Sequence, residues 1–530
     1  MKVFLMHPDR DFNPPPTGAW DTADLTKDLE LDTLWKAMAG EDSFLHGVAR
    51  EAFFSGLRND VDTILYRQAA LRDCLKNQDV VKYLYNLAVE AIEREKKEGF
   101  FGRGVSHYPA SILHSSISVL EMFSGMLRTL RDQARAHASR FDSEAFTRLF
   151  GMIETELDDD YLGQIDALLK ELKFKDGLLL SAELDSGNRG THYIVRRAGE
   201  RPHWWERLFD PHSAYSFRLD PRDERGAQAL SEIRDRGINQ VANVLGQSAD
   251  HILGFFQALR RELAFYVGCL SLNERLAALP AQLCFPQPMP TGSRRQGFRG
   301  LYDACLALQM GRTVVGNTVD AEGKSLVIIT GANQGGKSSF LRGIGLAQLM
   351  MQSGMFVAAE SFEAECCTGL FTHYKREEDA SMKSGKLDEE LARMSDIADR
   401  LVPNAIMLFN ESFAATNERE GSEIAGQVVR ALLEKHIKVF FVTHFYQFSH
   451  DFFDRKADDV LFLRAERLAD GTRTFRLVEG EPLETSHGED LYRKIFDDED
   501  GLANDATGGE AATVHDQTRK RSGEQGEGDA

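Results

Sequence analysis

The stretch from Thr330 to Arg342, which reads TGANQGGKSSFLR, constrains the fold of this chain more than any other. Within it, residues 331–338 match the pattern G-x-x-x-x-G-K-[ST], in which backbone N–H groups surround a phosphate. Residues 325–329 form a short apolar run typical of a buried strand, and residues 340–350 carry apolar side chains at helical spacing. Strand, glycine-rich loop and helix in this order predict a phosphate-binding loop.

Each part of this loop has a physical role in holding a nucleoside triphosphate. Glycines allow backbone conformations that a side chain would forbid, and the following helix directs its positive end at the anion. Lys337 can reach the β- and γ-phosphates, and the hydroxyl of Ser338 can ligate Mg²⁺. We therefore expect ATP and Mg²⁺ as cofactors. The expected nucleotide contacts of the loop are Gly331, Ala332, Asn333, Gln334, Gly335, Gly336, Lys337, Ser338 and Ser339.

Two further apolar runs end in polar residues that suit the same site. Residues 405–409 precede Asn410 and Glu411, which is the Walker B arrangement, and residues 438–442 precede Thr443 and His444. Glu411 would polarise the attacking water, and the residue before it usually holds Mg²⁺ through water. Here that residue is Asn410, which is neutral where an Asp is usual. A His at a strand end can touch a γ-phosphate, although a lone His is more often structural. We expect Glu411 and His444 to be catalytic, and Ser338, Asn410 and Glu411 to lie at the metal.

Length and composition predict several domains of an overall α/β chain. A chain of 530 residues is too long for one compact core. We expect an extended lead-in over residues 1–20 and a mostly helical domain over 21–279. A proline-rich boundary at 280–290 separates it from an ATPase domain over 291–496, and an acidic, disordered tail covers 497–530.

Apolar stripes at near-helical steps predict the helices of residues 21–175. The first helix carries Leu25, Leu29, Leu34 and Met38, and Asp21 and Thr22 can cap it. Further helices are expected near 60–75, 112–130, 146–157 and 168–172, with Leu168 among the apolar positions. These stripes are typical of core packing.

At Gly177 the period changes from helix to strand. A β hairpin is predicted near 177–197, and Tyr215 to Leu219 favour a third strand. A helix from 224 to 272 follows, with Leu230 and Ile233 on its stripe, and its length is typical of a lever or a coiled-coil arm.

The charge of the chain limits how it can meet nucleic acid. The formal charge is −20, of which residues 497–530, with ten acidic and three basic residues, supply −7. DNA contact therefore needs a local basic patch. Two clusters qualify, although runs of charge more often form solvated surface. They are Arg196, Arg197, Arg201 and Arg207 with Trp204 and Trp205, and Arg294, Arg295 and Arg299.

Nothing in the sequence indicates export or membrane insertion. The first residues lack the apolar segment of a signal peptide, and no uninterrupted apolar run approaches membrane-spanning length. The six cysteines show no metal-ligand spacing and are typical of reduced core thiols. We expect a cytoplasmic protein that makes no contact with a membrane.

Taken together, these motifs resemble the MutS family of DNA mismatch-repair ATPases. The loop is similar to the family's TG-x-N-x-GGKS pattern, and Val442-Thr443-His444 to its strand ending in Thr-His. The resemblance implies that Val315 and Asn317 hold the adenine and ribose. Asn410-Glu411, Thr416 and Glu420-Gly421 resemble the family's Asp-Glu-x-x-x-x-Thr-x-x-x-Asp-Gly block. Over residues 310–490 this implies an ABC-type P-loop ATPase, and residues 60–68 and 224–272 look like the family's helical lever domain.

Three departures from the family pattern bear on function. Asn410 replaces an Asp, and the Ser-x-Phe signature that reaches the partner's ATP corresponds loosely to Ser381–Asp388, where Ser384 or Gly385 could serve. No counterpart of the mismatch-reading domain is recognised. Its Phe-x-Glu wedge matches only Phe409-Asn410-Glu411, inside the Walker B strand.

The resemblance implies a dimeric clamp on double-stranded or branched DNA that binds and hydrolyses ATP, with weak mismatch discrimination. A homodimer is expected because an exposed phosphate loop leaves the γ-phosphate facing water. The alternative is an ABC-type ATPase switch that acts on branched DNA or a protein partner, with slow or no hydrolysis, which Asn410 favours.

Overall fold

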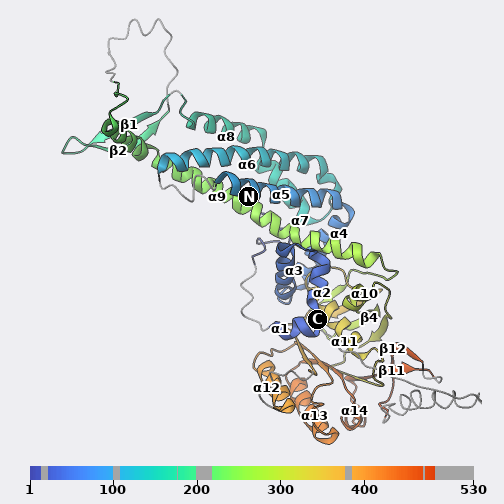
Figure 1. Cartoon of the computed structure of the whole chain (residues 1–530). Coiled ribbons are helices and arrows are strands. Elements are labelled where there is room, and N and C mark those ends of the chain that lie inside the picture. Colours follow the sequence, from blue (N-terminus) through green and yellow to red (C-terminus); the bar gives the residue numbers. More distant parts are fainter. Residues whose placement is uncertain are drawn as a thin grey trace, which may run out of the picture.

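The computed structural model describes residues 1–13, 22–99, 108–175, 177–197, 218–376, 385–468 and 472–483. Figure 1 shows an elongated molecule in which an arm of long helices stands on a base of shorter helices and β-sheets. A two-stranded hairpin lies at the far end of the arm. The expected α/β class and the mainly helical first half are confirmed.

The arm is built around one helix, α9 (Glu224–Ala277), which has 54 residues and packs along its neighbours α5 and α6. The long helix predicted at this place is confirmed. Side-chain oxygens of Asp60, Ser143, Asp158 and Asp223 accept first-turn N–H groups and so begin four of the arm helices. The other arm helices are α4 (Val61–Lys76), α5 (Gln78–Gly99), α6 (Pro109–His137), the short 3-10 helix η2 (Ala138–Arg140), α7 (Glu144–Glu156) and α8 (Asp159–Leu172).

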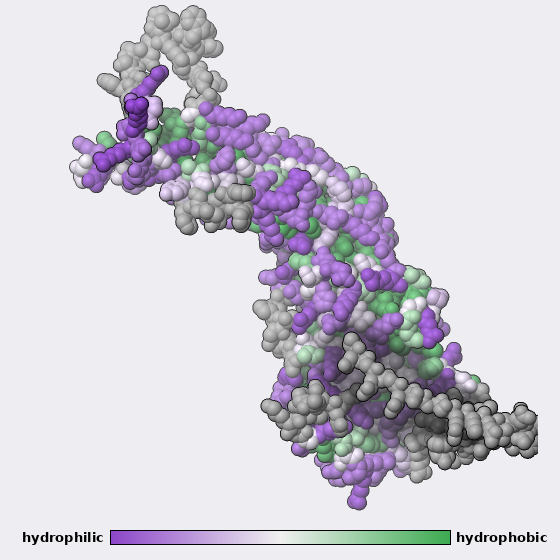
Figure 2. Space-filling view, viewed as in Figure 1, coloured by the Kyte–Doolittle hydropathy of each residue, from purple (hydrophilic) through white to green (hydrophobic). Residues whose placement is uncertain are grey.

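At its far end the arm exposes side chains that the periodicity placed in the core. Leu168, Leu230 and Ile233 are 51%, 52% and 39% exposed, so their predicted burial was wrong. At this end α9 is packed against the antiparallel hairpin of β1 (Leu179–Leu184) and β2 (Gly190–Arg196). Figure 2 shows apolar surface there. Of the third strand predicted at 215–219, residues 215–217 lie outside the described chain, and the other two are not in a strand.

Helix α6, with η2, is long and apolar enough to cross a membrane by length and composition. In the structure 56% of its most apolar window is buried, and its apolar stripe packs against α9. A core helix of a globular protein passes the same test, so one such helix is weak evidence for a span. The helix itself was predicted from its stripe near 112–130, but the count of uninterrupted apolar runs did not identify it as a candidate span.

The base of the arm contains α1 (Ala23–Asp28), α2 (Leu31–Ala39), α3 (Ser43–Gly56) and α10 (Ala304–Met310). The single first helix predicted from its apolar stripe was wrong, because the chain breaks at Leu29 and Glu30. Glu30 has a φ of +53°, in the left-handed region that interrupts a right-handed helix. Thr22 makes no side-chain cap at α1, and Asp21 lies outside the described residues.

Residues 1–13 form no helix or strand, yet they are packed into the root of the arm. Val3, Leu5, Met6 and Phe12 are at most 3% exposed. The buried carboxylate of Glu262 on α9 accepts the N–H groups of Leu5, Met6 and Phe12 at 2.6, 2.9 and 2.8 Å. The first residues are therefore part of the core that joins the arm to the base.

The larger sheet has six strands in the order β12-β11-β6-β10-β9-β8. Neighbouring strands run parallel except for β12, which is antiparallel to β11 at one edge. The three strands predicted from apolar runs are confirmed as β6, β9 and β10. The bounds are β6 (Leu326–Thr330), β8 (Leu370–Tyr374), β9 (Ile406–Asn410), β10 (Lys438–Val442), β11 (Val460–Arg467) and β12 (Arg473–Glu479).

Helices cover both faces of this sheet, which explains why its central strands are apolar throughout. Val327 and Ile329 of β6 face the core that contains α11 (Lys337–Gln352). Leu326 and Ile328 face the core that contains α12 (Lys386–Ala398), α13 (Glu418–Glu434) and α14 (Tyr446–Phe453). A smaller mixed sheet, which the sequence did not predict, has the order β3-β7-β4-β5. Its strands are β3 (Gln287–Met289), β4 (Gln296–Leu301), β5 (Asn317–Asp320) and β7 (Ser361–Glu365).

Candidate functional site

The strand register brings the predicted site segments to one edge of the larger sheet. In the parallel ladder, Ile329 of β6 lies opposite Val442 of β10, which in turn lies opposite Asn410 of β9. The glycine-rich loop, Glu411 and His444 therefore all leave the sheet at its carboxyl edge. In open α/β sheets this edge is where ligands bind.

The glycine-rich loop needs its glycines. Gly331 and Gly336 have φ values of +113° and +88°, and Gly336 is the N-cap of α11. A Cβ atom at Gly335 would lie 2.7 Å from the Cβ atom of Ala465 and 3.0 Å from the Ala332 carbonyl oxygen. The loop is thus closed tightly against β11, with the N-terminus of α11 pointing out of it.

Lys337 reaches back into the loop that precedes it. Its ammonium group donates hydrogen bonds to the carbonyl oxygens of Gly331 and Ala332, at 2.7 and 2.9 Å. The side chain is buried, and burial lowers the pKa of Lys337 to about 8, against the opposing effect of Glu411. A buried cation held only by neutral carbonyls is well placed to bind an anion.

Beside the loop lie the two strand-end pairs. The hydroxyl of Ser338 donates to the amide oxygen of Asn410 at 3.0 Å, and Nε2 of His444 lies 2.6 Å from Oε1 of Glu411. The hydrogen bond from His444 lowers the pKa of Glu411, with Lys337 adding to the effect and burial opposing it. Glu411 is therefore an anion at neutral pH.

The oxygen donors at this edge fit Mg²⁺ in kind. A hydroxyl, an amide oxygen and a carboxylate are hard ligands, and Mg²⁺ commonly binds through one or two protein carboxylates together with substrate phosphates. Within the described residues no group of three His, Cys, Asp or Glu side chains could hold a metal by itself. Any Mg²⁺ here would therefore need the nucleotide's phosphates as further ligands beside the Glu411 carboxylate.

A cavity of about 340 Å³ opens next to the first turn of α11, with mainly apolar walls. Val315, expected at the base, lines it and is 40% exposed. Asn317 lines it too, but its amide is occupied: Oδ1 accepts the N–H of Leu477 at 2.7 Å, and Nδ2 donates to the Phe475 carbonyl at 3.4 Å. The lining residues are Leu301, Tyr302, Asp303, Leu306, Met310, Arg312, Thr313, Val314, Val315, Asn317, Gly336, Ser339, Phe340 and Phe475.

Sequence reasoning missed two residues of β12 at this site. Phe475 has a φ of +59°, is 47% exposed and lines the cavity with its aromatic ring available for stacking. Arg473 donates from Nη1 to Oε1 of Gln334 in the loop at 2.6 Å. Both lie more than 130 residues after the loop, and no motif marks them, so only the antiparallel edge strand reveals them.

Arg342 ties the loop helix to the base of the arm. Its guanidinium group pairs with Asp303 at 2.5 Å and with Glu30 at the break between α1 and α2. The side chain is mostly buried, so the charges are paired where water cannot replace them. Arg342 therefore links α11 directly to the start of α2, since Glu30 is the N-cap of that helix.

The segments expected to meet a partner subunit or DNA are only partly described. Ser381 to Ser384 lie outside the described residues, and Gly385 is the N-cap of α12. In the first basic cluster, Arg196 donates to Ser181 and Arg197 pairs with Glu171. Four members of that cluster (Arg201, Trp204, Trp205 and Arg207) are likewise outside the described residues.

The second basic cluster is not an open patch of positive charge. Arg295 pairs with Glu322 at 2.6 Å and lies 3.7 Å from Glu363. With Arg299 it lines a groove of about 550 Å³ on the smaller sheet, where Glu360 also lies. Carboxylates thus lie beside Arg295 and Arg299 in the groove, which lowers the positive charge that they offer to a DNA backbone.

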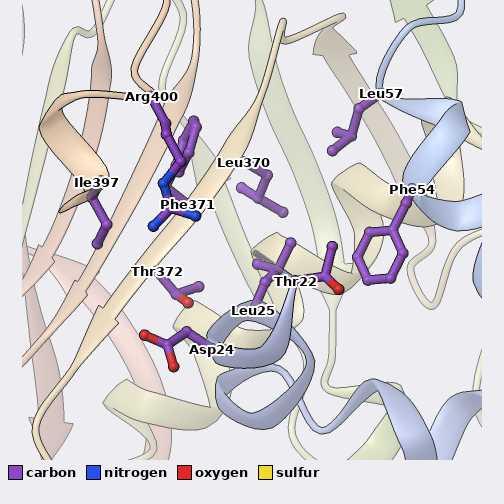
Figure 3. A pocket seen from close by; sticks show the side chains of 10 residues that line it. All are labelled: Thr22, Asp24, Leu25, Phe54, Leu57, Leu370, Phe371, Thr372, Ile397 and Arg400. Atoms are coloured by element: carbon purple, nitrogen blue, oxygen red, sulfur yellow. The ribbon is translucent and has the colours of Figure 1, made fainter. Parts of the chain in front are cut away.

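A further cavity lies where the base of the arm meets the larger sheet. Figure 3 shows it between α1, the end of α3, β8 and the end of α12, with Asp24 and Thr372 facing each other at one side. Its volume is about 30 Å³, which holds about one water molecule and no larger ligand.

Two family models match this chain. Residues 59–279 match the MutS2 N-terminal domain, and residues 327–494 match MutS domain V. MutS protein homolog 4 of Mus musculus is 26% identical over 345 residues, which is 63% of this chain and 34% of that protein. The DNA mismatch repair protein MutS of Porphyromonas gingivalis is 31% identical over 134 residues, 25% of this chain and 15% of that protein. The matched part spans about a third or less of these relatives' length.

Proposed function

Since this chain belongs to the MutS family and is related to DNA mismatch-repair proteins, we propose that it binds and hydrolyses MgATP and acts on DNA as a homodimer. The observation that carries the proposal is the meeting of Lys337, Ser338 and Glu411 at one sheet edge, beside an apolar cavity of nucleotide size. The larger sheet and its helices are proposed to form an ABC-type P-loop ATPase domain, and the arm its lever.

The residues of the site divide the work of binding and hydrolysis. Lys337 exchanges its two carbonyl partners for phosphate oxygens, and the N-terminus of α11 adds its partial positive charge. Val315 and Phe475 enclose the base in the cavity. Glu411, kept ionised by its hydrogen bond with His444, polarises the attacking water. His444 lies at the end of the neighbouring strand and would face the γ-phosphate while it keeps this bond.

Ser338, Asn410 and Glu411 would hold Mg²⁺, which neutralises charge on the phosphates during transfer. The 3.0 Å hydrogen bond between Ser338 and Asn410 already places their oxygens side by side. Asn410 supplies an oxygen but no negative charge, so the proposed site binds Mg²⁺ less tightly than one with an Asp.

Assembly into a homodimer would complete each ATP site. The support is the position of α12, whose start at Gly385 follows the segment that resembles a partner-contacting signature. Sedimentation velocity at micromolar protein, with and without saturating MgATP, tests this. A dimer that tightens with MgATP is expected, and a monomer under saturating MgATP would contradict it.

DNA contact is proposed to read shape more than sequence. No aromatic wedge is recognised in the chain, and arginine contacts to phosphates position a protein without reading bases. Binding to homoduplex, G·T mismatch and branched DNA should be measured at matched salt, with and without MgATP. We expect salt-sensitive binding with a preference for junctions or flaps. Tenfold tighter binding to the mismatch, about 1.4 kcal/mol, would refute this.

The second candidate function is a slow or inactive ATPase switch that acts on branched DNA or a protein partner. Asn410 favours it, as does the pairing of Arg295 with carboxylates, which weakens the support for one of the two expected DNA contacts. A steady-state ATPase assay separates the two: a switch binds ATP with little turnover, whereas the first proposal requires turnover that depends on Glu411.

A further inference from the structure

The turn that carries Glu411 has a left-handed backbone conformation at two residues that are not glycine. Glu411 and Phe413 have φ values of +53° and +63°, in the left-handed region that side chains other than glycine rarely adopt. Between them lies Ser412, which is fully buried. Two such residues in three positions persist only where surrounding contacts hold them.

His373 of β8 supplies those contacts. Its Nδ1 atom lies 2.8 Å from the hydroxyl of Ser412, which also bonds to the His373 carbonyl oxygen. Its ring stacks on Phe413, with the centroids 5.3 Å apart and the ring planes inclined by 23°. The side chain that pins Ser412 therefore also supports the strained residue after it.

The other ring nitrogen of His373 reaches a different element. Nε2 lies 2.9 Å from the carbonyl oxygen of Glu390 on α12. A carbonyl only accepts, so Nε2 carries the proton. The single hydroxyl proton of Ser412 is then shared between Nδ1 and the carbonyl oxygen, both of which belong to His373. Burial lowers the pKa of His373 to about 4, so the ring is neutral and this tautomer is fixed.

We propose that His373 is a positioning residue for ATP hydrolysis, which aims Glu411 by pinning Ser412 and ties this turn to α12. The inference rests on the proposed function. His373 is fully buried and contacts Ser412, so it acts on Glu411 through the Ser412 turn. Helix α12 begins just after the segment that resembles a partner-contacting signature. The bond from His373 to Glu390 therefore connects the proposed dimer contact to Glu411, the residue that polarises the attacking water.

Helix α12 is itself held by contacts with β8 and with α1 at the base of the arm. Arg393 of α12 donates to the Tyr374 carbonyl at 3.2 Å and lies 3.4 Å from Asp24 of α1. Arg376, at the end of β8, also pairs with Asp24. The base of the arm, α12 and the end of β8 thus meet within three residues of His373, close to the small cavity of Figure 3.

Single-turnover ATP hydrolysis, measured together with equilibrium ATP binding, tests the proposal. Ser412→Ala removes the pinned hydroxyl with little change in volume. We expect at least a tenfold slower turnover with the ATP dissociation constant changed less than twofold, because misplacement affects catalysis more than binding. Ser449→Ala is the matched control: its hydroxyl is equally buried in α14 and bonds only within its own helix. It should change neither quantity.

Two variants of the histidine separate positioning from packing. His373→Asn keeps a polar atom near the place of Nδ1, whereas His373→Gln keeps one near the place of Nε2. The Asn variant should turn over ATP faster than the Gln variant; the reverse order would overturn the pinning of Ser412. If the natural chain hydrolyses ATP and Ser412→Ala matches it, this inference falls alone. If the natural chain hydrolyses none, the proposed function falls with it.

Discussion

Two glutamates, one at the root of the arm and one at the edge of the larger sheet, show how differently this chain uses the same side chain. Glu262 on α9 is fully buried, and both of its oxygens accept N–H groups from residues 1–13. Burial raises the pKa of Glu262 to about 7, although those N–H groups act in the other direction. At Glu411 the hydrogen bond from His444 lowers the pKa instead.

The two glutamates differ in how many of their carboxylate oxygens already accept a hydrogen bond within the protein. Every oxygen of Glu262 is used inside the protein, so its role is to hold the first residues against the arm. Glu411 uses Oε1 on His444, and its carboxylate lies at the sheet edge where Lys337 acts on it. A satisfied carboxylate contributes to stability, and one with free capacity beside a cation contributes to chemistry.

The largest expected difference between the two glutamates appears when the charge at the sheet edge is removed. Glu411→Gln should lower the ATP turnover number by about 100-fold or more, because the attacking water loses its base. The midpoint of thermal unfolding and the ATP dissociation constant should stay near natural values. Hydrolysis by this variant at the natural rate would show that another residue is the base.

At the root of the arm the same kind of change should act on stability. Glu262→Ala leaves three buried N–H groups without an acceptor and should cost about 3–5 kcal/mol of folding free energy, seen as a lower unfolding midpoint. Glu274→Ala, on the same helix, removes an exposed ion pair with Lys82 and should cost less than about 1 kcal/mol. Equal losses in the two variants would remove the special role given to Glu262.

Features of the fold and the site could be predicted from the sequence where they depend on residues close together in the chain. The loop of residues 331–338, the strand ends at Glu411 and His444 and the helix around 224–272 were all predicted, because each is encoded in a local pattern. The role of Glu262 was not, since its partners lie about 250 residues away and make only backbone contacts. Phe475, Arg473 and His373 were missed for the same reason: the sheet order, not the local pattern, brings them to the site.

A smaller effect should follow from restoring charge at the metal position. Asn410→Asp adds a second carboxylate beside Ser338, and groups that orient a metal commonly change affinity or activity by about 10- to 100-fold. In a Mg²⁺ titration at saturating ATP, we expect half-maximal turnover at a lower Mg²⁺ concentration, or a higher turnover number. A variant with unchanged Mg²⁺ dependence and rate would separate Asn410 from the metal.

The smallest expected effect is on the pH dependence of ATP binding. The pKa of Lys337 is lowered to about 8 without nucleotide, and bound phosphates raise it. Below pH 8 the free lysine is already charged and affinity should be flat. Above it, binding must take up a proton, so the dissociation constant should rise by up to about tenfold per pH unit. Affinity that stays flat from pH 7 to 9.5 would contradict this.

The carboxyl edge of the larger sheet is the proposed ATP site, and two buried lysines, one at each end of the sheet, allow a direct test. Lys337 lies at this edge, whereas Lys438 lies at the opposite end of β10; both are buried, and burial lowers the pKa of each to about 8. Equilibrium dialysis with labelled ATP and Mg²⁺ should compare the natural chain with Lys337→Met and Lys438→Met. Binding of ATP should be saturable, should weaken at least 100-fold in Lys337→Met and should stay unchanged in Lys438→Met. Equal affinity in all three proteins would contradict the proposed site.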